Sequence, residues 1–260
     1  MLWDIAYIVE ILTPKHRGVD PAPEDMERFA HRYMKALELG CAVSIPDNPL
    51  GNLRHNALDI FEDLGLRIDP ERTLLNLNTY HSKGDLDKLL ENAAQSGLRY
   101  LLVIRGDGSP KLQKLQPEDF GVETKMITSI DLIEYIIRSY GDTFCLGTAF
   151  NQYKPESVEL RKLARKKSAG ARFIVTQPVM GRDERVTRLM HEGIPVILEA
   201  WMSPKVDIFF RSVKGSVEMD LDDFDPVRNL RLLHEVHPQT SIYLSMLHFE
   251  ADWSSILPRL

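Results

Sequence analysis

A glutamate lies inside an apolar stretch near the start of the chain, in the sequence YIVEIL at 7–12. Burying a carboxylate among isoleucine, valine and leucine side chains is costly unless the group is neutral or paired. The same cost raises the pKa of a buried carboxyl, and a general acid that works at neutral pH needs a raised pKa. We therefore predict Glu10 as a catalytic acid.

A second set of charged residues follows the apolar run RYLLVI at 99–104, where the chain continues as Arg105, Gly106 and Asp107. If that run is a buried strand, two opposite charges come at its end, separated by a residue without a side chain. A glycine at this point allows a ligand to approach the backbone closely. We interpret the charges as groups kept for chemistry. The alternative is a surface ion pair between Arg105 and Asp107.

Gln177 ends another apolar run, RFIVTQ at 172–177. Its side-chain amide donates and accepts hydrogen bonds at once, which suits the amide-like edge of a heterocycle. Polar residues thus come at the same end of several apolar runs. This arrangement indicates one binding site assembled from several elements.

The elements that would position these residues are short apolar runs that alternate with helical segments. Eight apolar or β-branched runs occur, at 7–12, 42–45, 73–78, 100–106, 144–150, 172–177, 195–200 and 241–247. Segments with apolar residues at helical spacing lie between most of them, among them 23–40, 85–97 and 155–170. Parallel strands need such crossover helices, so this order predicts an α/β fold, a (β/α)8 TIM barrel forming a single domain over 1–260. An open doubly wound sheet is the alternative. Barrels carry their functional residues at the C-terminal ends of the strands.

Composition and charge argue against several other classes of protein. The formal net charge of −6 provides no basic field for a phosphate backbone, so we expect no nucleic-acid partner. No apolar run approaches the roughly 20 residues of a membrane helix, and Asp4 and Glu10 lie where a signal peptide needs an uncharged core. We expect a cytoplasmic protein with no membrane partner. Cys41 and Cys145 are too few for a disulfide framework and lack zinc-site spacing, so we predict no metal site.

Several stretches resemble methylenetetrahydrofolate reductases. VEILTPK at 9–15 resembles the Glu-aromatic-aromatic-Pro-Pro opening of that family, and LLVIRGD at 101–107 resembles its Leu-Arg-Gly-Asp strand. AFNQYKPES at 149–157 and LARKKSAGARFIVTQP at 163–178 are similar to its fifth and sixth β/α units. The resemblance runs from about residue 7 to 200 and returns weakly at 242–250.

The resemblance implies a flavoprotein oxidoreductase on a TIM barrel. FAD would lie across the C-terminal mouth, take a hydride from NADH or NADPH, and pass it to 5,10-methylenetetrahydrofolate, giving 5-methyltetrahydrofolate. By this resemblance Glu10 is the general acid that protonates the folate nitrogen, Asp107 stabilises the cation between flavin and folate, and Gln177 hydrogen-bonds the pterin. The positions that match the flavin site are Arg105, Gly106, Phe150, Arg165 and Lys166.

A basic face on the predicted helix at 155–170 agrees with part of this interpretation. It consists of Arg161, Lys162, Arg165, Lys166 and Lys167. Such a face can bind a pyrophosphate or the glutamate tail of a folate. The alternative is an ordinary solvated helix face.

The chain departs from the family pattern around the expected flavin. The family's flavin-contacting histidine falls on Leu77, although Thr79 is kept, and the family's Thr-Tyr-Gly reads PDN, beginning with Pro46. The family's Pro-Gly-Ile-Leu-Pro loop reads EAWMSP at 199–204. These changes alter the contacts on which FAD would depend.

Three functions therefore stay open. The first is an FAD-dependent methylenetetrahydrofolate reductase, and the second is a folate-binding one-carbon enzyme on the same barrel that has lost its flavin. The third is a non-catalytic partner subunit of a larger one-carbon complex. For partners, the resemblance implies a folate or related pterin as substrate, with a homo-oligomer or a one-carbon complex as the assembly.

Overall fold

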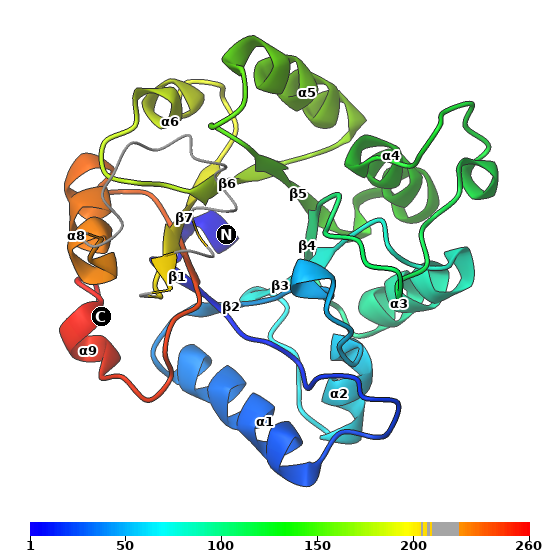
Figure 1. The fold of residues 1–260 in the computed structure, drawn as a ribbon, viewed down its shortest axis with the longest axis horizontal. Coiled ribbons are helices and arrows are strands. Elements are labelled where there is room, and N and C mark those ends of the chain that lie inside the picture. Colours follow the sequence, from blue (N-terminus) through cyan, green and yellow to red (C-terminus); the bar gives the residue numbers. More distant parts are fainter. Residues whose placement is uncertain (204, 207–208, 210–223) are drawn as a thin grey trace.

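Eight parallel strands form a closed barrel at the centre of the molecule (Figure 1). The computed structural model describes residues 1–260 apart from 204, 207–208 and 210–223. The strands are β1 (Tyr7–Glu10), β2 (Ala42–Ile45), β3 (Thr73–Leu77), β4 (Tyr100–Val103), β5 (Cys145–Phe150), β6 (Phe173–Pro178), β7 (Val196–Trp201) and β8 (Ile242–Ser245). Each strand pairs with the next, and β8 pairs with β1 through Ile242 opposite Tyr7. This closure excludes the open doubly wound sheet and confirms the predicted TIM barrel.

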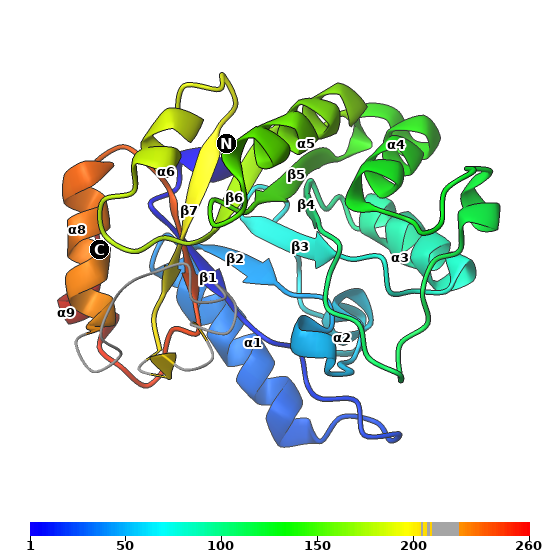
Figure 2. The ribbon, with the colours of Figure 1, turned by 45° about the horizontal axis from the view of Figure 1, so that its top comes forward.

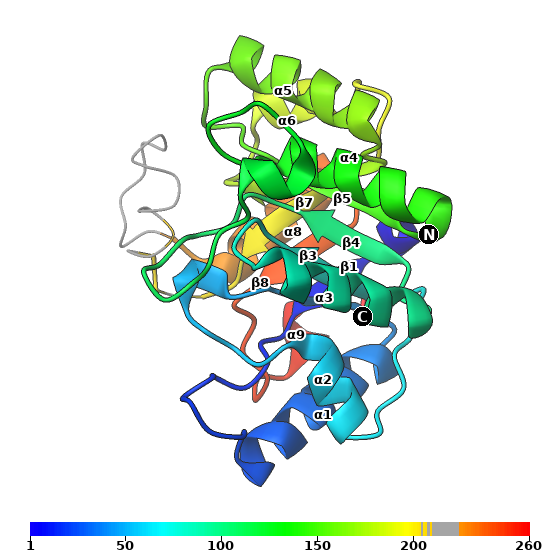
Figure 3. The same cartoon turned by 90° about the vertical axis from the view of Figure 1, so that its right-hand side faces the viewer.

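Helices surround the barrel on its outside, as Figure 1 shows. Those described are α1 (Pro23–Glu38), α2 (Ala57–Asp63), α3 (Lys83–Gln95), α4 (Ser129–Tyr140), α5 (Glu156–Ala169), α6 (Glu184–Leu189), α8 (Pro226–Val236) and α9 (Trp253–Ile256), with 3-10 helices η1 (Leu2–Asp4), η2 (Pro49–Gly51), η3 (Pro117–Phe120) and η4 (Gly141–Thr143). The oblique view of Figure 2 shows the strands inside this layer, and Figure 3 shows α2 to α5 following one another along one wall. In the part of the chain that the structure describes, no helix is long and apolar enough to cross a membrane.

Alternate residues of each strand face the inside of the barrel, because the side chains of a strand have a period of two. The interior cluster contains Ile8, Ala42, Leu74, Tyr100, Phe173, Ile197 and Tyr243, among others. A larger cluster between strands and helices contains Val9, Val43, Leu75, Leu101, Ile174, Leu198 and Leu244, among others. The same alternation directs Glu10 and Glu199 inward, at the carboxyl ends of β1 and β7.

The 3-10 helix η1 fills the end of the barrel opposite these carboxyl ends. Leu2 is fully buried in the interior cluster, and its backbone N–H donates to the Tyr100 hydroxyl over 3.3 Å. The ring centroids of Trp3 and Phe173 lie 5.9 Å apart. Figure 1 shows the N-terminus lying within the ring of strands. The amino-terminal end of the barrel is thus plugged by the chain's own first residues.

Several of the strands end before their predicted ends at the mouth, whereas β6 and β7 each extend one residue further than predicted. β1 ends at Glu10 rather than at residue 12, and β4 ends at Val103 rather than at residue 106. Beyond β4 the chain turns away from the barrel wall, and Gly106 has a φ of +76°. The predicted helices at 23–40, 85–97 and 155–170 are found as α1, α3 and α5, with ends that differ by one or two residues. The mouth is therefore built from turns that follow short strands.

Candidate active site

The carboxyl of Glu10 accepts hydrogen bonds at the mouth from β8 and the turn after it. The Tyr243 hydroxyl donates to Glu10 Oε2 over 2.9 Å, and the Met246 backbone also donates to this carboxyl. Met246 has a φ of +62°, an uncommon conformation for a residue with a side chain. Burial raises the pKa of Glu10, whereas the two hydrogen bonds and the charge of Arg54 lower it. The net pKa is raised, which is the direction that a general acid requires.

A second carboxyl, that of Glu199, lies close to the first and was not among the predicted site residues. Its Cα is opposite that of Tyr243 in the β7–β8 pairing, and its side chain hydrogen-bonds that of Ser245. Burial and the charge of Glu10 raise the pKa of Glu199 to about 8, although the Ser245 hydrogen bond lowers it. The signal for it was present, since VILEA at 196–200 encloses a glutamate among apolar residues as YIVEIL does. The resemblance assigned this position to a loop, but β7 continues to Trp201, and residue 204 of that loop lies outside the described residues.

Gln177 lies near the end of β6, where the strand is irregular. The register with β7 shifts between Val175 and Pro178, so the direction of the Gln177 side chain does not follow from simple alternation. The Gln152 amide clamps the backbone of Gln177 by accepting from its N–H over 3.2 Å and donating to its carbonyl over 2.8 Å. Among the described residues no hydrogen-bond partner is recorded for the Gln177 side chain. The structure thus fixes the backbone and leaves the predicted heterocycle-binding amide available.

The Arg-Gly-Asp turn is held by the loop after β3. The Arg105 carbonyl accepts from the Thr79 N–H over 3.3 Å and from the Thr79 hydroxyl over 2.9 Å. A Cβ on Gly106 would lie 2.5 Å from the Cβ of Asn78, so the space beside this glycine is taken by a protein side chain. Arg105 and Asp107 are exposed, and no ion pair joins them within the described part of the chain. A glycine is therefore needed between the two charged residues because the turn packs against Asn78 at this position.

A buried histidine–aspartate pair joins the loops after β2 and β3. His81 Nε2 lies 2.6 Å from Asp47 Oδ2, and both side chains are 11% exposed. The same carboxylate oxygen accepts from the Asn78 N–H over 3.2 Å. Burial lowers the pKa of His81, but the hydrogen bond and charge of Asp47 raise it more, and the net pKa is raised. The family's flavin-contacting histidine falls on Leu77, whose side chain packs in the outer cluster, and His81, four residues later, was not among the predicted site residues.

The residues predicted on α5 and at the end of β5 lie in the outer layer of the barrel. Phe150 is buried in the cluster between strands and helices. The Lys166 ammonium donates to the Ala149 carbonyl over 2.7 Å, and burial lowers the pKa of Lys166 to about 8. Arg165 is exposed on α5. The structure therefore does not bring Phe150, Arg165 and Lys166 together with Glu10 in one cradle.

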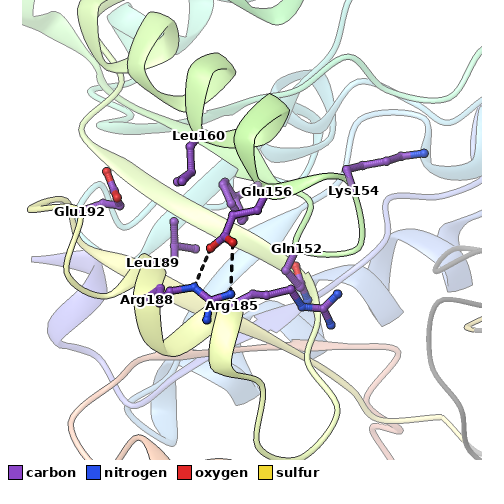
Figure 4. A pocket seen from close by; sticks show the side chains of 9 residues that line it. Gln152, Lys154, Glu156, Leu160, Arg185, Arg188, Leu189 and Glu192 are labelled. Atoms are coloured by element: carbon purple, nitrogen blue, oxygen red, sulfur yellow. Dashed lines mark hydrogen bonds and ion pairs between the residues drawn. The ribbon is translucent and has the colours of Figure 1, made fainter.

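A pocket in this outer layer lies between α5 and α6 (Figure 4). Arg188 and Glu156 face each other across it, with Arg188 Nε 2.7 Å from Glu156 Oε1. Its other lining residues are Phe150, Gln152, Lys154, Leu160, Arg185, Leu189 and Glu192. None of the carboxyls at the barrel mouth lines this pocket, although Gln152, which holds the Gln177 backbone, does. Among the described residues no group of three or more histidine, cysteine, aspartate or glutamate side chains could hold a metal ion.

The fold and the site together define a (β/α)8-barrel protein whose mouth carries two enclosed carboxyls and a histidine–aspartate pair. The family model for methylenetetrahydrofolate reductase matches residues 5–193. The chain belongs to the methylenetetrahydrofolate reductase family, which confirms the resemblance.

Curated relatives match shorter parts of the chain. It is 37% identical over 106 residues to methylenetetrahydrofolate reductase 2 of Schizosaccharomyces pombe, a match covering 36% of this chain and 16% of that protein. It is 35% identical over 99 residues to methylenetetrahydrofolate reductase 2 of Saccharomyces cerevisiae, covering 35% of this chain and 16% of that protein. The matched part is thus a small share of each relative's length.

Solved structures with the same fold are much less similar in sequence. The 7,8-dihydropteroate synthase from Vibrio fischeri has a TM-score of 0.52 and 12% identity, over 94% of this chain and 88% of that chain. The Yersinia pestis enzyme with a pterine–sulfa conjugate has a TM-score of 0.53 and 12% identity, over 94% of this chain and 89% of that chain. At such identities the likeness shows the fold alone.

Proposed function

We propose that this barrel reduces 5,10-methylenetetrahydrofolate to 5-methyltetrahydrofolate, with NADH or NADPH as the reductant. Family membership supports this proposal. The observation that carries it is the Glu10 carboxyl, enclosed at the mouth and held by Tyr243 and Met246 with a raised pKa. The reaction needs a proton donor at this kind of place, because a folate nitrogen must be protonated before the one-carbon bridge can accept a hydride.

In this proposal Glu10, Gln177 and Asp107 have separate roles in the reaction. Glu10 gives its proton to the folate nitrogen as the five-membered ring opens, which leaves a cationic one-carbon unit on the other nitrogen and a carboxylate on Glu10. A hydride then adds to that carbon and completes the methyl group, and Glu10 regains a proton from solvent. Gln177 orients the pterin edge through its free amide, and Asp107 stabilises the cation from the Arg-Gly-Asp turn.

A separate question is whether the protein binds FAD. Family members generally use FAD, which carries a hydride from a nicotinamide to the folate. The residues that the resemblance assigned to FAD do not form one cradle in this structure, because Leu77 and Phe150 face the helix layer and Lys166 is occupied by the Ala149 carbonyl. This observation favours a second candidate, a folate-dependent one-carbon enzyme on the same barrel that does not hold flavin.

The test is to incubate the full chain with 5,10-methylenetetrahydrofolate and NADH or NADPH, with and without added FAD. We expect oxidation of the nicotinamide matched by formation of 5-methyltetrahydrofolate. Glu10→Gln should abolish folate reduction, because the amide cannot donate the proton. If FAD is bound, flavin reduction by the nicotinamide should be nearly unchanged in that variant. Folate binding without turnover would contradict the proposed reaction and favour a non-catalytic subunit, and a visible flavin spectrum in the purified protein would contradict the flavin-free candidate.

A further inference from the structure

Two carboxyls approach the same tyrosine from opposite sides of one strand. β8 lies between β7 and β1 in the barrel, with the Cα of Tyr243 opposite that of Glu199 on one side and that of Ile8 on the other. The Tyr243 hydroxyl donates to Glu10 over 2.9 Å. Burial and the charges of both glutamates raise the pKa of Tyr243, so its hydroxyl stays a proton donor. The geometry therefore links Glu10 and Glu199 through a neutral side chain.

The charged and titratable neighbours of the two carboxyls differ. Glu10 faces the Arg54 cation, the Tyr243 hydroxyl and the Met246 backbone. Glu199 faces the Ser245 hydroxyl and the Glu10 carboxylate, and its charge raises the pKa of the Tyr153 and Tyr243 hydroxyls. Within the described residues no cation is recorded beside Glu199. Two enclosed carboxyls with one nearby cation cannot both ionise without mutual repulsion in this low-dielectric mouth.

We propose that Glu199 is a positioning residue for Glu10, and that the two carboxyls titrate as one coupled pair that holds a single proton between them across neutral pH. When both would otherwise be ionised, the charge of one retains the proton on the other. When Glu10 gives this proton to the folate, both carboxyls are ionised, and their mutual repulsion favours the return of a proton from solvent to Glu10. The coupling stands on the structure, and its catalytic consequence rests on the proposed function.

The first experiment needs no substrate. Carbon-13 NMR of the full chain with labelled glutamate side chains follows each carboxyl through a pH titration, and Glu10→Gln and Glu199→Gln identify the two resonances. In Glu199→Gln, the midpoint of Glu10 should fall by about one pH unit or more. Glu199→Asp should restore most of the shift, and Glu235→Gln, at an exposed position on α8, should leave the midpoint unchanged.

Reciprocity provides a second variant in case Glu199→Gln does not fold. Coupling between two sites acts equally in both directions, so Glu10→Gln should lower the midpoint of Glu199 by the same amount. An unchanged midpoint for the remaining carboxyl in either folded variant would overturn the proposal. Two independent titrations near the ordinary glutamate range in the unmodified protein would also overturn it.

The second experiment connects the pair to catalysis. The basic limb of the pH profile of kcat/KM should move to lower pH in Glu199→Gln, by the same shift as the NMR midpoint, while KM for the folate changes little. A uniform loss of activity at every pH would indicate a structural role and overturn the positioning role. If no folate reduction is detected in any form of the protein, the proposed function fails, and the NMR titration still decides the coupling.

Discussion

The two charges of the Arg-Gly-Asp turn are exposed side chains on opposite sides of one glycine, and we expect them to do different things. Asp107→Asn keeps the shape and removes the charge. We expect it to slow folate reduction by about 10²-fold with little change in folate affinity, because a carboxylate stabilises a cation that forms only on the way to the transition state. Single-turnover measurement of the folate step checks this.

Arg105→Ala provides the comparison for that variant. If Arg105 holds the reductant or cofactor, its loss should raise the KM for the nicotinamide or flavin and leave the rate at saturation only modestly lower. Equal, small effects of both substitutions on the folate step would mean that neither charge takes part in the chemistry.

At the scale of elements, the connection between β4 and α4 depends on Gly106. This residue has a φ of +76°, and an added Cβ would meet Asn78 at 2.5 Å. We expect Gly106→Ala to lower the free energy of unfolding by about 2–4 kcal/mol, because backbone strain and overpacking add. Urea denaturation monitored by circular dichroism measures the loss.

The matched control lies in the same connection. Gly121 has a φ of +64°, but an added Cβ there would have no atom within 4 Å. Gly121→Ala should therefore lower the free energy of unfolding by only about 1 kcal/mol, which is the cost of backbone strain alone. Similar losses for both variants would show that contact with Asn78 does not matter.

For the whole molecule, two histidines should make opposite contributions to the pH dependence of stability. The pKa of His81 is raised above its ordinary value of 6.5, so its contribution is complete below pH 6.5 and is lost as the pH rises through the folded-state value. Burial, and to a smaller degree the charge of Arg259, lower the pKa of His234 to about 4, so its contribution is complete above pH 6.5 and is lost as the pH falls toward 4.

Thermal unfolding between pH 4 and 9 tests this contrast. The difference in stability between the unmodified protein and His81→Gln should be largest on the acid side of neutrality and shrink toward high pH. The difference in stability between the unmodified protein and His234→Gln should change in the opposite direction. It should be largest above pH 6.5 and shrink as the pH falls toward 4. If both substitutions change stability equally at every pH, the Asp47–His81 pair does not depend on the charge of the imidazole.

The barrel was predictable because its signals are local. Each strand is a short apolar run and each helix between them has its own periodicity, so the order of elements follows from the chain alone. The raised pKa of Glu10 was predictable for the same reason, because its apolar flanks are its neighbours in sequence. The link from Glu10 to Glu199 depends on the pairing of β8 with both β7 and β1, which brings together residues 189 positions apart. No local pattern contains that register.

The pair of Asp47 and His81 escaped prediction for a similar reason. It forms between two loops whose distance is set by the pairing of β2 with β3. The role of Gly106 was predicted as room for a ligand, whereas the structure shows a neighbouring asparagine in that space. The sequence shows that a glycine is present, but it does not show whether a ligand or a neighbouring side chain occupies the space beside it.

The plug at the amino-terminal end of the barrel has a kinetic consequence. Because Leu2 and Trp3 fill that end, we expect Glu10 and Glu199 to exchange protons with bulk water through the mouth. A substrate lying across the mouth covers the same route. Proton uptake by the spent acid should then wait for product to leave, and a solvent isotope effect should fall on the recovery phase between turnovers rather than on the hydride step.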